Sequence, residues 1–279
     1  MTVKITGFAD EIAPELTAQI AGLKGLGMSY VEMRGVDGEN LIYHTDEKVE
    51  QIKKTLDDNG IRLSALGSPL GKILITDDFT PHFEEFKRAV EISHKMECPT
   101  IRMFSFYLPQ ESDPAAYEGE VLDYASANDT LLLHENEKDI YGAMAPECKK
   151  LMDTFYGDHF KAIFDFANFV QCGQDTLEAY EMLKSYIAYI HVKDALKSDQ
   201  SVVPAGYGDG NVAVILKRLS ASGFDGFLSL EPHLFEFEGF HALEKDGRSI
   251  AVKEKKVLSG LETFTIAHDA LMKLLDNCM

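Results

Sequence analysis

The chain has 279 residues, of which 45% are hydrophobic, and its 46 acidic and 27 basic residues give a net charge of −19. The acidity disfavours a nucleic-acid partner, because phosphate contacts require clustered Lys and Arg. No apolar run approaches the ~20 residues that a membrane-spanning helix needs, so no membrane partner is expected. Nothing linker-like divides the sequence, which predicts a single domain over residues 1–279 with a sizeable core.

The expected elements alternate between strands and helices along the chain. Apolar runs predict strands over residues 3–8, 29–34, 61–66, 99–104, 131–136, 160–165, 187–192 and 227–231. Apolar residues at spacings of three and four predict helices over residues 14–26, 46–59, 81–95, 114–127, 146–155, 176–184, 212–222 and 261–275. The segment 235–257 has no regular pattern, and we expect it to be irregular.

Eight strand–helix units of roughly 35 residues each fit a (β/α)8 TIM barrel, whereas the competing α/β architecture is an open doubly wound sheet. No GxGxxG motif follows any predicted strand. Four consecutive strands instead end in residues of metal-ligand type. A barrel gathers the carboxyl ends of all its strands around one mouth, whereas an open sheet spreads them along an edge, so the sequence favours the barrel.

The four strand-end residues are Glu135, Asp165, His191 and Glu231. Taken alone, Asp165 could cap a turn and His191 could pack in the core. Buried carboxylates need partners, however, and Pro232 holds Glu231 in an extended conformation. Three carboxylates and one imidazole together predict one divalent cation, with Mn²⁺ or Mg²⁺ favoured and Zn²⁺ or Co²⁺ as alternatives.

The sequence around these residues resembles the xylose-isomerase-like barrel superfamily, and its sugar phosphate isomerase/epimerase branch most of all. The similar segments are His134-Glu135-Asn136, Asp165-Phe166-Ala167-Asn168, His191-Val192-Lys193-Asp194, Glu231-Pro232-His233 and the loop 204–210. This resemblance covers essentially the whole chain. It implies a small carbohydrate substrate and one divalent cation held by the four strand-end residues.

In the epimerases of this family the two glutamates are also the acid/base pair. The resemblance therefore implies that Glu135 and Glu231 remove and return a proton beside a carbonyl, on opposite faces of the substrate. The cation would bind the carbonyl and hydroxyl oxygens and stabilise the enediolate. The predicted function is a metal-dependent isomerase or epimerase of a sugar, sugar acid or sugar phosphate.

The chain departs from the ketose 3-epimerases at two places. Asn168 stands where those enzymes usually have a histidine, and residues 137–141 stand where they have a second glutamate. A metal-dependent dehydratase of the inosose type, which is a lyase, is therefore the main alternative. An apurinic-site endonuclease is less favoured, because Asn168 replaces a metal histidine of that cluster. A non-catalytic sugar-binding barrel is less favoured because all four ligands are intact.

Further polar residues near strand ends are candidates for substrate binding. They are Lys193, Asn168, Arg102, Arg34, His233 and Lys138, with Glu32, Ser68 and Lys72 as weaker candidates. Lys193 is favoured, because it shares the strand face of His191 two residues earlier. By the same alternation His134 points away from the face of Glu135, and we expect it to pack behind the barrel wall.

Two expectations concern the setting of the protein. The cysteines have no CxxC spacing, and the first five residues enter a strand pattern without a signal peptide, so the cytoplasm is expected. Alternating aromatic and acidic residues in the segment 235–240 predict one dry face, which would cover the barrel mouth or form a homodimer contact.

Overall fold

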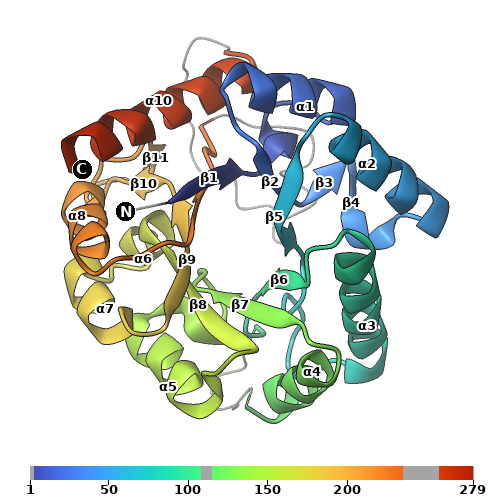
Figure 1. The fold of residues 1–279 in the computed structure, drawn as a ribbon. Helices are drawn as coiled ribbons and strands as arrows, with labels where there is room; N and C mark the ends of the chain where they lie inside the picture. Colours follow the sequence, from blue (N-terminus) through green and yellow to red (C-terminus); the bar gives the residue numbers. More distant parts are fainter. Residues whose placement is uncertain (1–2, 108–114, 235–257, 279) are drawn as a thin grey trace.

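The computed structural model describes residues 3–107, 115–234 and 258–278. Its centre is a sheet of eight parallel strands in the order β1-β12-β9-β8-β7-β6-β5-β2. The strands are β1 (Lys4–Gly7), β2 (Tyr30–Met33), β5 (Arg62–Gly67), β6 (Thr100–Met103), β7 (Leu131–Glu135), β8 (Phe160–Asp165), β9 (Ile187–Val192) and β12 (Phe227–Leu230). The sheet curls into a nearly closed barrel, in which β1 comes to lie beside β2 (Figure 1).

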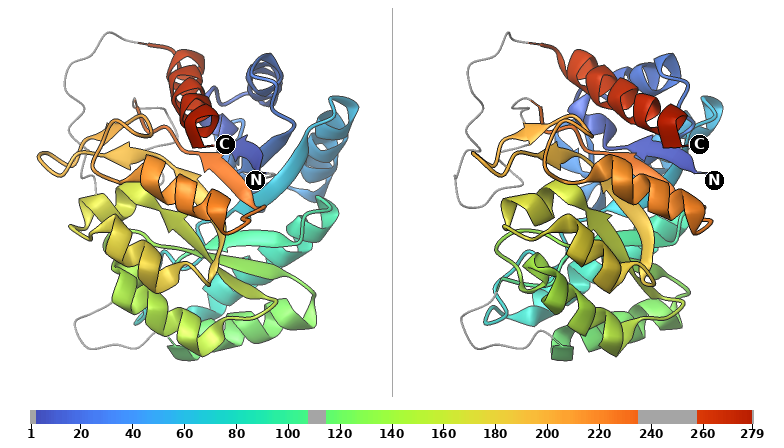
Figure 2. Two further views of the ribbon diagram at one scale, coloured as in Figure 1. Left: turned by 60° about the vertical axis from the view of Figure 1, so that its left-hand side comes forward. Right: turned by 90° about the vertical axis from the view of Figure 1, so that its left-hand side faces the viewer.

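Helices surround the barrel on its outside (Figures 1 and 2). They are α1 (Leu16–Gly25), α2 (Asp46–Asp58), α3 (Phe79–Lys95), α4 (Ala115–Ala127), α5 (Ala145–Phe155), α7 (Thr176–Leu183), α8 (Val212–Ala221) and α10 (Gly260–Cys278). The last helix, α10, lies between α8 and α1 and thereby completes the ring. The predicted TIM barrel is confirmed.

Several short features of the described residues were not predicted, among them the 3-10 helices η1 (Ala9–Glu11), η2 (Leu41–Tyr43) and η3 (Tyr141–Ala143). The helix α6 (Phe166–Gln171) follows β8 directly, and two small antiparallel pairs join β3 (Gly35–Val36) to β4 (Glu39–Asn40) and β10 (Asp194–Ala195) to β11 (Val202–Val203). Such two- to six-residue elements carry too few residues for a periodic signal. The expected irregular segment 235–257, including the expected dimer contact, lies outside the described residues.

The barrel interior is closed below the strand ends by side chains two residues before the predicted ligands. Leu133, Ile163 and Tyr189 are buried and pack on one another. The Tyr189 hydroxyl is 2.8 Å from Ser64 Oγ, which in turn is 2.8 Å from Thr6 Oγ1. Because side chains alternate along a strand, this layer places the next inward residues of β7, β8 and β9 at the barrel mouth.

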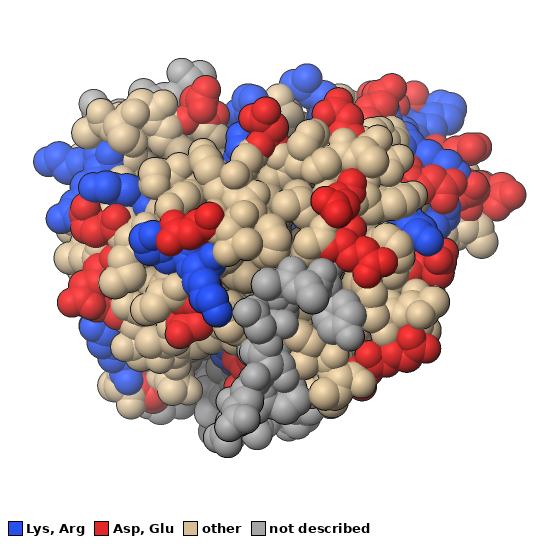
Figure 3. Space-filling model, turned by 90° about the horizontal axis from the view of Figure 1, so that it is seen from below, with Lys and Arg blue, Asp and Glu red and all other residues tan. Residues whose placement is uncertain are grey.

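The outer surface carries charged side chains of both signs. On the face drawn in Figure 3, Lys and Arg are interspersed with Asp and Glu. Some pairs follow helical spacing, as in Lys149–Asp153 on α5 and Lys54–Asp58 on α2. Within the described residues, no helix combines the length and apolar character needed to cross a membrane.

Candidate metal and substrate site

The structure brings the four predicted ligands together at the carboxyl ends of neighbouring strands. Glu135 and Asp165 end β7 and β8, His191 lies in β9, and Glu231 follows β12. Each side chain is buried, with at most 5% of its residue exposed. One ligand atom from each residue lies within 4.8 Å of those of the other three. This spacing suits a single cation held by four protein groups.

The two oxygens of Asp165 have different partners. Oδ1 accepts the backbone N–H of Asn168 at 2.8 Å and so caps helix α6. Oδ2 is fully buried and has no hydrogen-bond partner. Burial raises the pKa of Asp165 to about 7, against the opposing effect of Lys193. Oδ2 lies 3.2 Å from the Lys193 ammonium but makes no hydrogen bond, so it can serve as a ligand atom for a divalent cation, because buried polar atoms are usually hydrogen-bonded.

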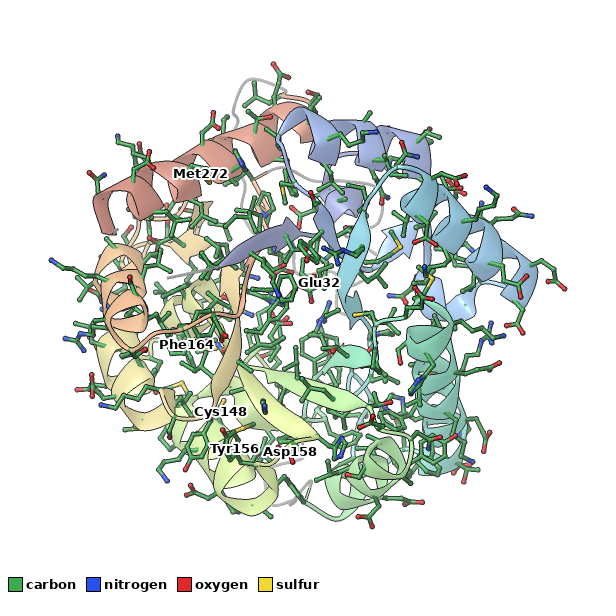
Figure 4. The ribbon with its side chains drawn as sticks, in the orientation of Figure 1. Glu32, Cys148, Tyr156, Asp158, Phe164 and Met272 are labelled. Atoms are coloured by element: carbon green, nitrogen blue, oxygen red, sulfur yellow. The ribbon has the colours of Figure 1, made fainter. Side chains whose placement is uncertain are left out.

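His191 is held from both sides by carboxylates. Its Nε2 lies 3.1 Å from Glu32 Oε2, and its Nδ1 lies 2.8 Å from Glu135 Oε1. Glu32 projects from β2 into the barrel (Figure 4) and also accepts a 2.6 Å hydrogen bond from Ser229. Burial alone would lower the pKa of His191, but Glu135 and Glu32 raise it well above its usual value.

A carboxylate behind a metal-binding histidine fixes which ring nitrogen is free to bind the metal. Here Glu32 stands behind Nε2, so Nδ1 faces the other ligands. The sequence pattern indicated Glu32 only as a substrate candidate. Its pairing with His191 joins β2 to β9, two strands that are not neighbours in the sheet.

Two asparagines orient the ligands of β7 and β8. Asn136 Oδ1 accepts the Asp165 N–H at 2.9 Å, and its Nδ2 donates to the Asp165 carbonyl at 3.0 Å. Asn168, a predicted substrate residue, donates from Nδ2 to the Asn136 carbonyl at 2.9 Å and to Glu135 Oε1 at 3.4 Å. Asn168 is thus a neighbour of the predicted ligand Glu135.

Lys193 lies within the ligand cluster itself. Its Nζ is 2.6 Å from Glu231 Oε2 and 3.2 Å from Asp165 Oδ2. Burial alone would lower the pKa of Lys193, but Asp165 and Glu231 raise it above its usual value. The strand alternation that favoured Lys193 therefore placed it correctly at the barrel mouth.

Arg34 and His233 adjoin the far side of Glu231. Arg34 donates to Asp10 at 2.8 and 3.0 Å, and its Nη1 lies 3.4 Å from Glu231 Oε1. His233 Nε2 is 3.4 Å from the same oxygen, and its backbone N–H donates to Glu11 at 2.8 Å. Burial raises the pKa of Glu11 to about 8, although Arg34 opposes the shift. Glu11 was not predicted as a site residue, although it follows the first apolar run as the four predicted ligands follow theirs.

Arg102 reaches the cluster from β6. Its guanidinium lies 4.4 Å from the ring centroid of Phe104 and 5.3 Å from that of Phe8. Arg102 Nε is 3.4 Å from Glu135 Oε2, yet this buried nitrogen makes no hydrogen bond.

Lys72, from the loop after β5, and Lys138, from the loop after β7, both lie beside Glu137. Lys72 Nζ is 3.3 Å from Glu137 Oε2 and 4.3 Å from the ring centroid of Phe104. Lys138 is half-buried, and its backbone N–H donates to Glu137 Oε1 at 3.1 Å. Lys138 is therefore located in the loop that follows β7.

A cavity of about 1200 Å³ adjoins the cluster. Arg34, Arg102, Lys72, Asn40 and Ser68 contribute to its lining. Arg34 and Arg102 contact Glu231 and Glu135 respectively, so they stand between the cavity and the predicted ligands. The volume is sufficient for a small-molecule substrate.

The glycine-rich loop between β11 and α8 is organised by Asp194 of β10. This buried carboxylate accepts the backbone N–H groups of Gly206 (3.1 Å), Gly208 (3.0 Å) and Gly210 (2.8 Å). A Cβ atom at Gly208 would lie 2.5 Å from Asp194 Oδ1 and from the Ala195 carbonyl. The glycines therefore allow the backbone to approach the carboxylate closely, next to Lys193.

His134 packs behind the barrel wall, as strand alternation predicted. It is 1% exposed, stacks near Phe160 and lies 2.8 Å from Ser105 Oγ through Nε2. Burial lowers its pKa from 6.5 to about 3, so the imidazole is neutral in the folded protein at pH 7.

Comparison with known proteins agrees with this architecture. A family model described as the xylose isomerase-like TIM barrel matches residues 20–251. A search of curated proteins by sequence finds no match. Because the family model spans most of the chain, the protein belongs to the family of xylose isomerase-like TIM barrels, as its sequence motifs predicted.

Solved structures with the same fold include three with informative descriptions. The IolI protein with a bound zinc atom has a TM-score of 0.77 and 16% identity, with 99% of each chain covered. The probable 3-DHS dehydratase AsbF of Bacillus anthracis has a TM-score of 0.72 and 16% identity, covering 98% of this chain and 99% of its own. D-allulose 3-epimerase of Methylomonas sp. in complex with D-allulose has a TM-score of 0.74 and 13% identity, covering 99% and 97%.

Proposed function

We propose that the protein is an isomerase or epimerase of a small carbohydrate and depends on one divalent cation. The observation that carries the proposal is the convergence of Glu135, Asp165, His191 and Glu231, with ligand atoms within 4.8 Å of one another. These four residues would hold the cation, with Mn²⁺ or Mg²⁺ favoured and Zn²⁺ or Co²⁺ as alternatives. When bound, it supplies Lewis-acid stabilisation of negative charge that develops on substrate oxygens.

Glu231 and Glu135 are the proposed proton carriers. Burial alone would raise the pKa of Glu231, but Lys193 and His233 help to hold it well below the usual value. Its carboxylate is therefore ionised and can accept a proton, although the low pKa makes it a weaker base than an ordinary glutamate as long as Lys193 stays beside it. Glu231 follows β12 and Glu135 ends β7, and the strands β9 and β8 lie between these two in the barrel. Glu135 would therefore approach the substrate from a different side than Glu231. Lys193, Asn168, Arg102, Arg34, His233 and Lys138 are the proposed substrate contacts.

Dehydration is the second candidate, and the position of Lys193 favours it. Its ammonium lies 2.6 Å from Glu231 Oε2, so a base and a proton donor stand side by side. Glu231 would take a proton beside the carbonyl, and Lys193 would protonate a hydroxyl leaving from the next carbon. The similarity in fold to a dehydratase is compatible with this candidate.

The test is solvent deuterium exchange into a panel of sugars, sugar acids and sugar phosphates, with Mn²⁺ present. Incorporation into a substrate or its isomer without loss of water supports the isomerase, whereas loss of water identifies a dehydratase. Glu231→Gln and Glu135→Gln should abolish exchange, and Glu178→Gln on the exposed side of α7 should leave it unchanged. Full activity of either site variant would contradict its proposed role.

A further inference from the structure

Among the described residues, four permanent cations beside the ligand cluster, Arg34, Lys193, Lys72 and Arg102, each lie within 3.4 Å of a carboxylate. Arg34 bonds to Asp10, Lys193 lies 2.6 Å from Glu231, and Lys72 lies 3.3 Å from Glu137. The carboxylates beside Arg34, Lys193 and Lys72 neutralise these three charges within the protein, so these cations need no external anion. Arg102 also has a carboxylate nearby, that of Glu135 at 3.4 Å, but its buried Nε makes no hydrogen bond.

Arg102 is 5% exposed, and its Nε has no hydrogen-bond partner. Its nearest carboxylate, Glu135, is 3.4 Å away, is shared with His191 and is a proposed ligand of the cation. Leaving a donor of a buried guanidinium unmet costs free energy, on the order of 1–3 kcal/mol for a polar group and more for a charged one. The structure therefore retains a cation whose hydrogen-bonding capacity is unfilled.

The guanidinium is also held rigidly and borders open space. It lies on the rings of Phe104 and Phe8, at 4.4 and 5.3 Å from their centroids. Ser68 Oγ donates to the backbone carbonyl of Arg102 at 2.5 Å and ties β6 to the loop after β5. Arg102 lines the cavity of about 1200 Å³. A preorganised guanidinium of this kind binds an anion with little loss of conformational entropy.

We propose that the substrate is an acid whose carboxylate binds Arg102 while its reacting carbon lies at the ligand cluster. This inference rests on the proposed function and narrows its substrate class to sugar acids or related hydroxy-keto acids. The planar fork of Arg matches a carboxylate through two parallel hydrogen bonds. Because Arg102 Nε lies 3.4 Å from Glu135, the bound carboxylate stands close to the reacting carbon.

The charges of the cavity favour a carboxylate over a phosphate. Asp77, Asp78 and Glu85 also line this cavity, as do Asp10, which is neutralised by Arg34, and Glu11, whose raised pKa of about 8 keeps it largely protonated at pH 7. The repulsion of an anion therefore comes from Asp77, Asp78 and Glu85. A dianionic phosphate would be repelled by these side chains about twice as strongly as a carboxylate, since the Coulomb energy scales with charge.

The experiment compares three probes that share a hydroxy-ketone. Hydroxypyruvate carries a carboxylate, dihydroxyacetone a neutral hydroxymethyl group, and dihydroxyacetone phosphate a phosphate. Their dissociation constants are measured by calorimetry on Mn²⁺-saturated protein, for the natural chain, Arg102→Gln, Arg102→Lys and the control Arg62→Gln. The control residue Arg62 also lies over an aromatic ring, that of Tyr30. It is the first residue of β5 and so lies at the end of that strand away from the barrel mouth. Thermal unfolding and Mn²⁺ stoichiometry verify that each variant is folded and loaded.

We expect Arg102→Gln to weaken hydroxypyruvate by about 10- to 100-fold while changing dihydroxyacetone little, because a charge-assisted pair is lost. Arg102→Lys should lose less, and Arg62→Gln nothing. An undiminished preference for the acid in Arg102→Gln would overturn the inference. So would tighter binding of the phosphate than of hydroxypyruvate, or no binding of any probe. If the inference fails in one of these ways, deuterium exchange into neutral sugars would still support the proposed function. Failure of the inference can therefore be distinguished from failure of the proposed function.

Discussion

At the scale of single residues, the contact between Glu32 and His191 fixes the orientation of the imidazole at the candidate metal site. The carboxylate of Glu32 bonds to Nε2 at 3.1 Å and to Ser229 at 2.6 Å. Burial alone would raise the pKa of Glu32, but His191 lowers it, so Glu32 is ionised. The imidazole is thus held in one orientation before any cation arrives.

Glu32→Gln should therefore weaken metal binding. We expect the Mn²⁺ dissociation constant to rise by about 10- to 100-fold, the usual effect of removing a residue that orients a metal-binding histidine. Calorimetric titration measures this change, with Glu50→Gln on the exposed side of α2 as the matched control. An unchanged affinity in folded Glu32→Gln would show that His191 is oriented by other contacts.

His134 predicts how stability depends on pH. Its pKa falls from 6.5 to about 3 on folding, because burial disfavours the charged form. The unfolded chain therefore binds one more proton than the folded chain between these values. The stabilising contribution is fully present above pH 6.5 and is lost as the pH falls toward 3, at about 1.4 kcal/mol per pH unit.

Urea unfolding between pH 6.5 and 5 measures this dependence above the range where most carboxylates titrate. His134→Gln retains a hydrogen-bonding group for Ser105 but cannot titrate. Its free energy of unfolding should fall less steeply with acid than that of the natural chain. Equal slopes for the two proteins would mean that His134 does not govern acid sensitivity in this window.

At the scale of elements, the loop between β11 and α8 shows why glycine recurs between Gly206 and Gly210. Asp194 collects three of its backbone N–H groups, and Gly208 approaches the carboxylate too closely for a side chain. Gly208→Ala should lower the free energy of unfolding by about 1–3 kcal/mol. Gly25→Ala, in open space at the end of α1, should raise it by up to about 1 kcal/mol. Chemical denaturation measures both, and equal stability of Gly208→Ala would contradict the close contact.

The sequence allowed prediction of the long elements and of the convergence of the four strand-end residues, because both depend on local patterns. That these residues bind a cation stays a prediction. Strand alternation alone placed Lys193 at the mouth and His134 behind the wall. Contacts between distant strands could not be predicted in the same way. Glu32 meets His191 across the barrel, and Glu11 joins Glu231 only because β1 pairs with β12. Those neighbours follow from strand order and curvature, which no local pattern contains.

At the scale of the whole molecule, a cation held by four strands should stabilise the barrel. Ligand binding to the folded state adds about 2.7 kcal/mol when the free cation is 100-fold above its dissociation constant. We therefore expect Mn²⁺ to raise the unfolding temperature and EDTA to reverse the effect. Asp165→Asn can still cap α6 but loses a charged ligand, so its shift should be much smaller. Equal shifts in both proteins would place Mn²⁺ elsewhere.

The ammonium of Lys193 has a consequence for how the protein is assembled. Three carboxylates gathered in a dry barrel mouth would repel one another and oppose folding. Lys193 supplies a counter-charge from within the chain, 2.6 Å from Glu231 and 3.2 Å from Asp165. Folding therefore need not wait for a metal ion. If a cation binds here as proposed, its loading would be an exchange of one cation for another, and the displaced Lys193 ammonium, on its flexible stem, would be free to contact the substrate.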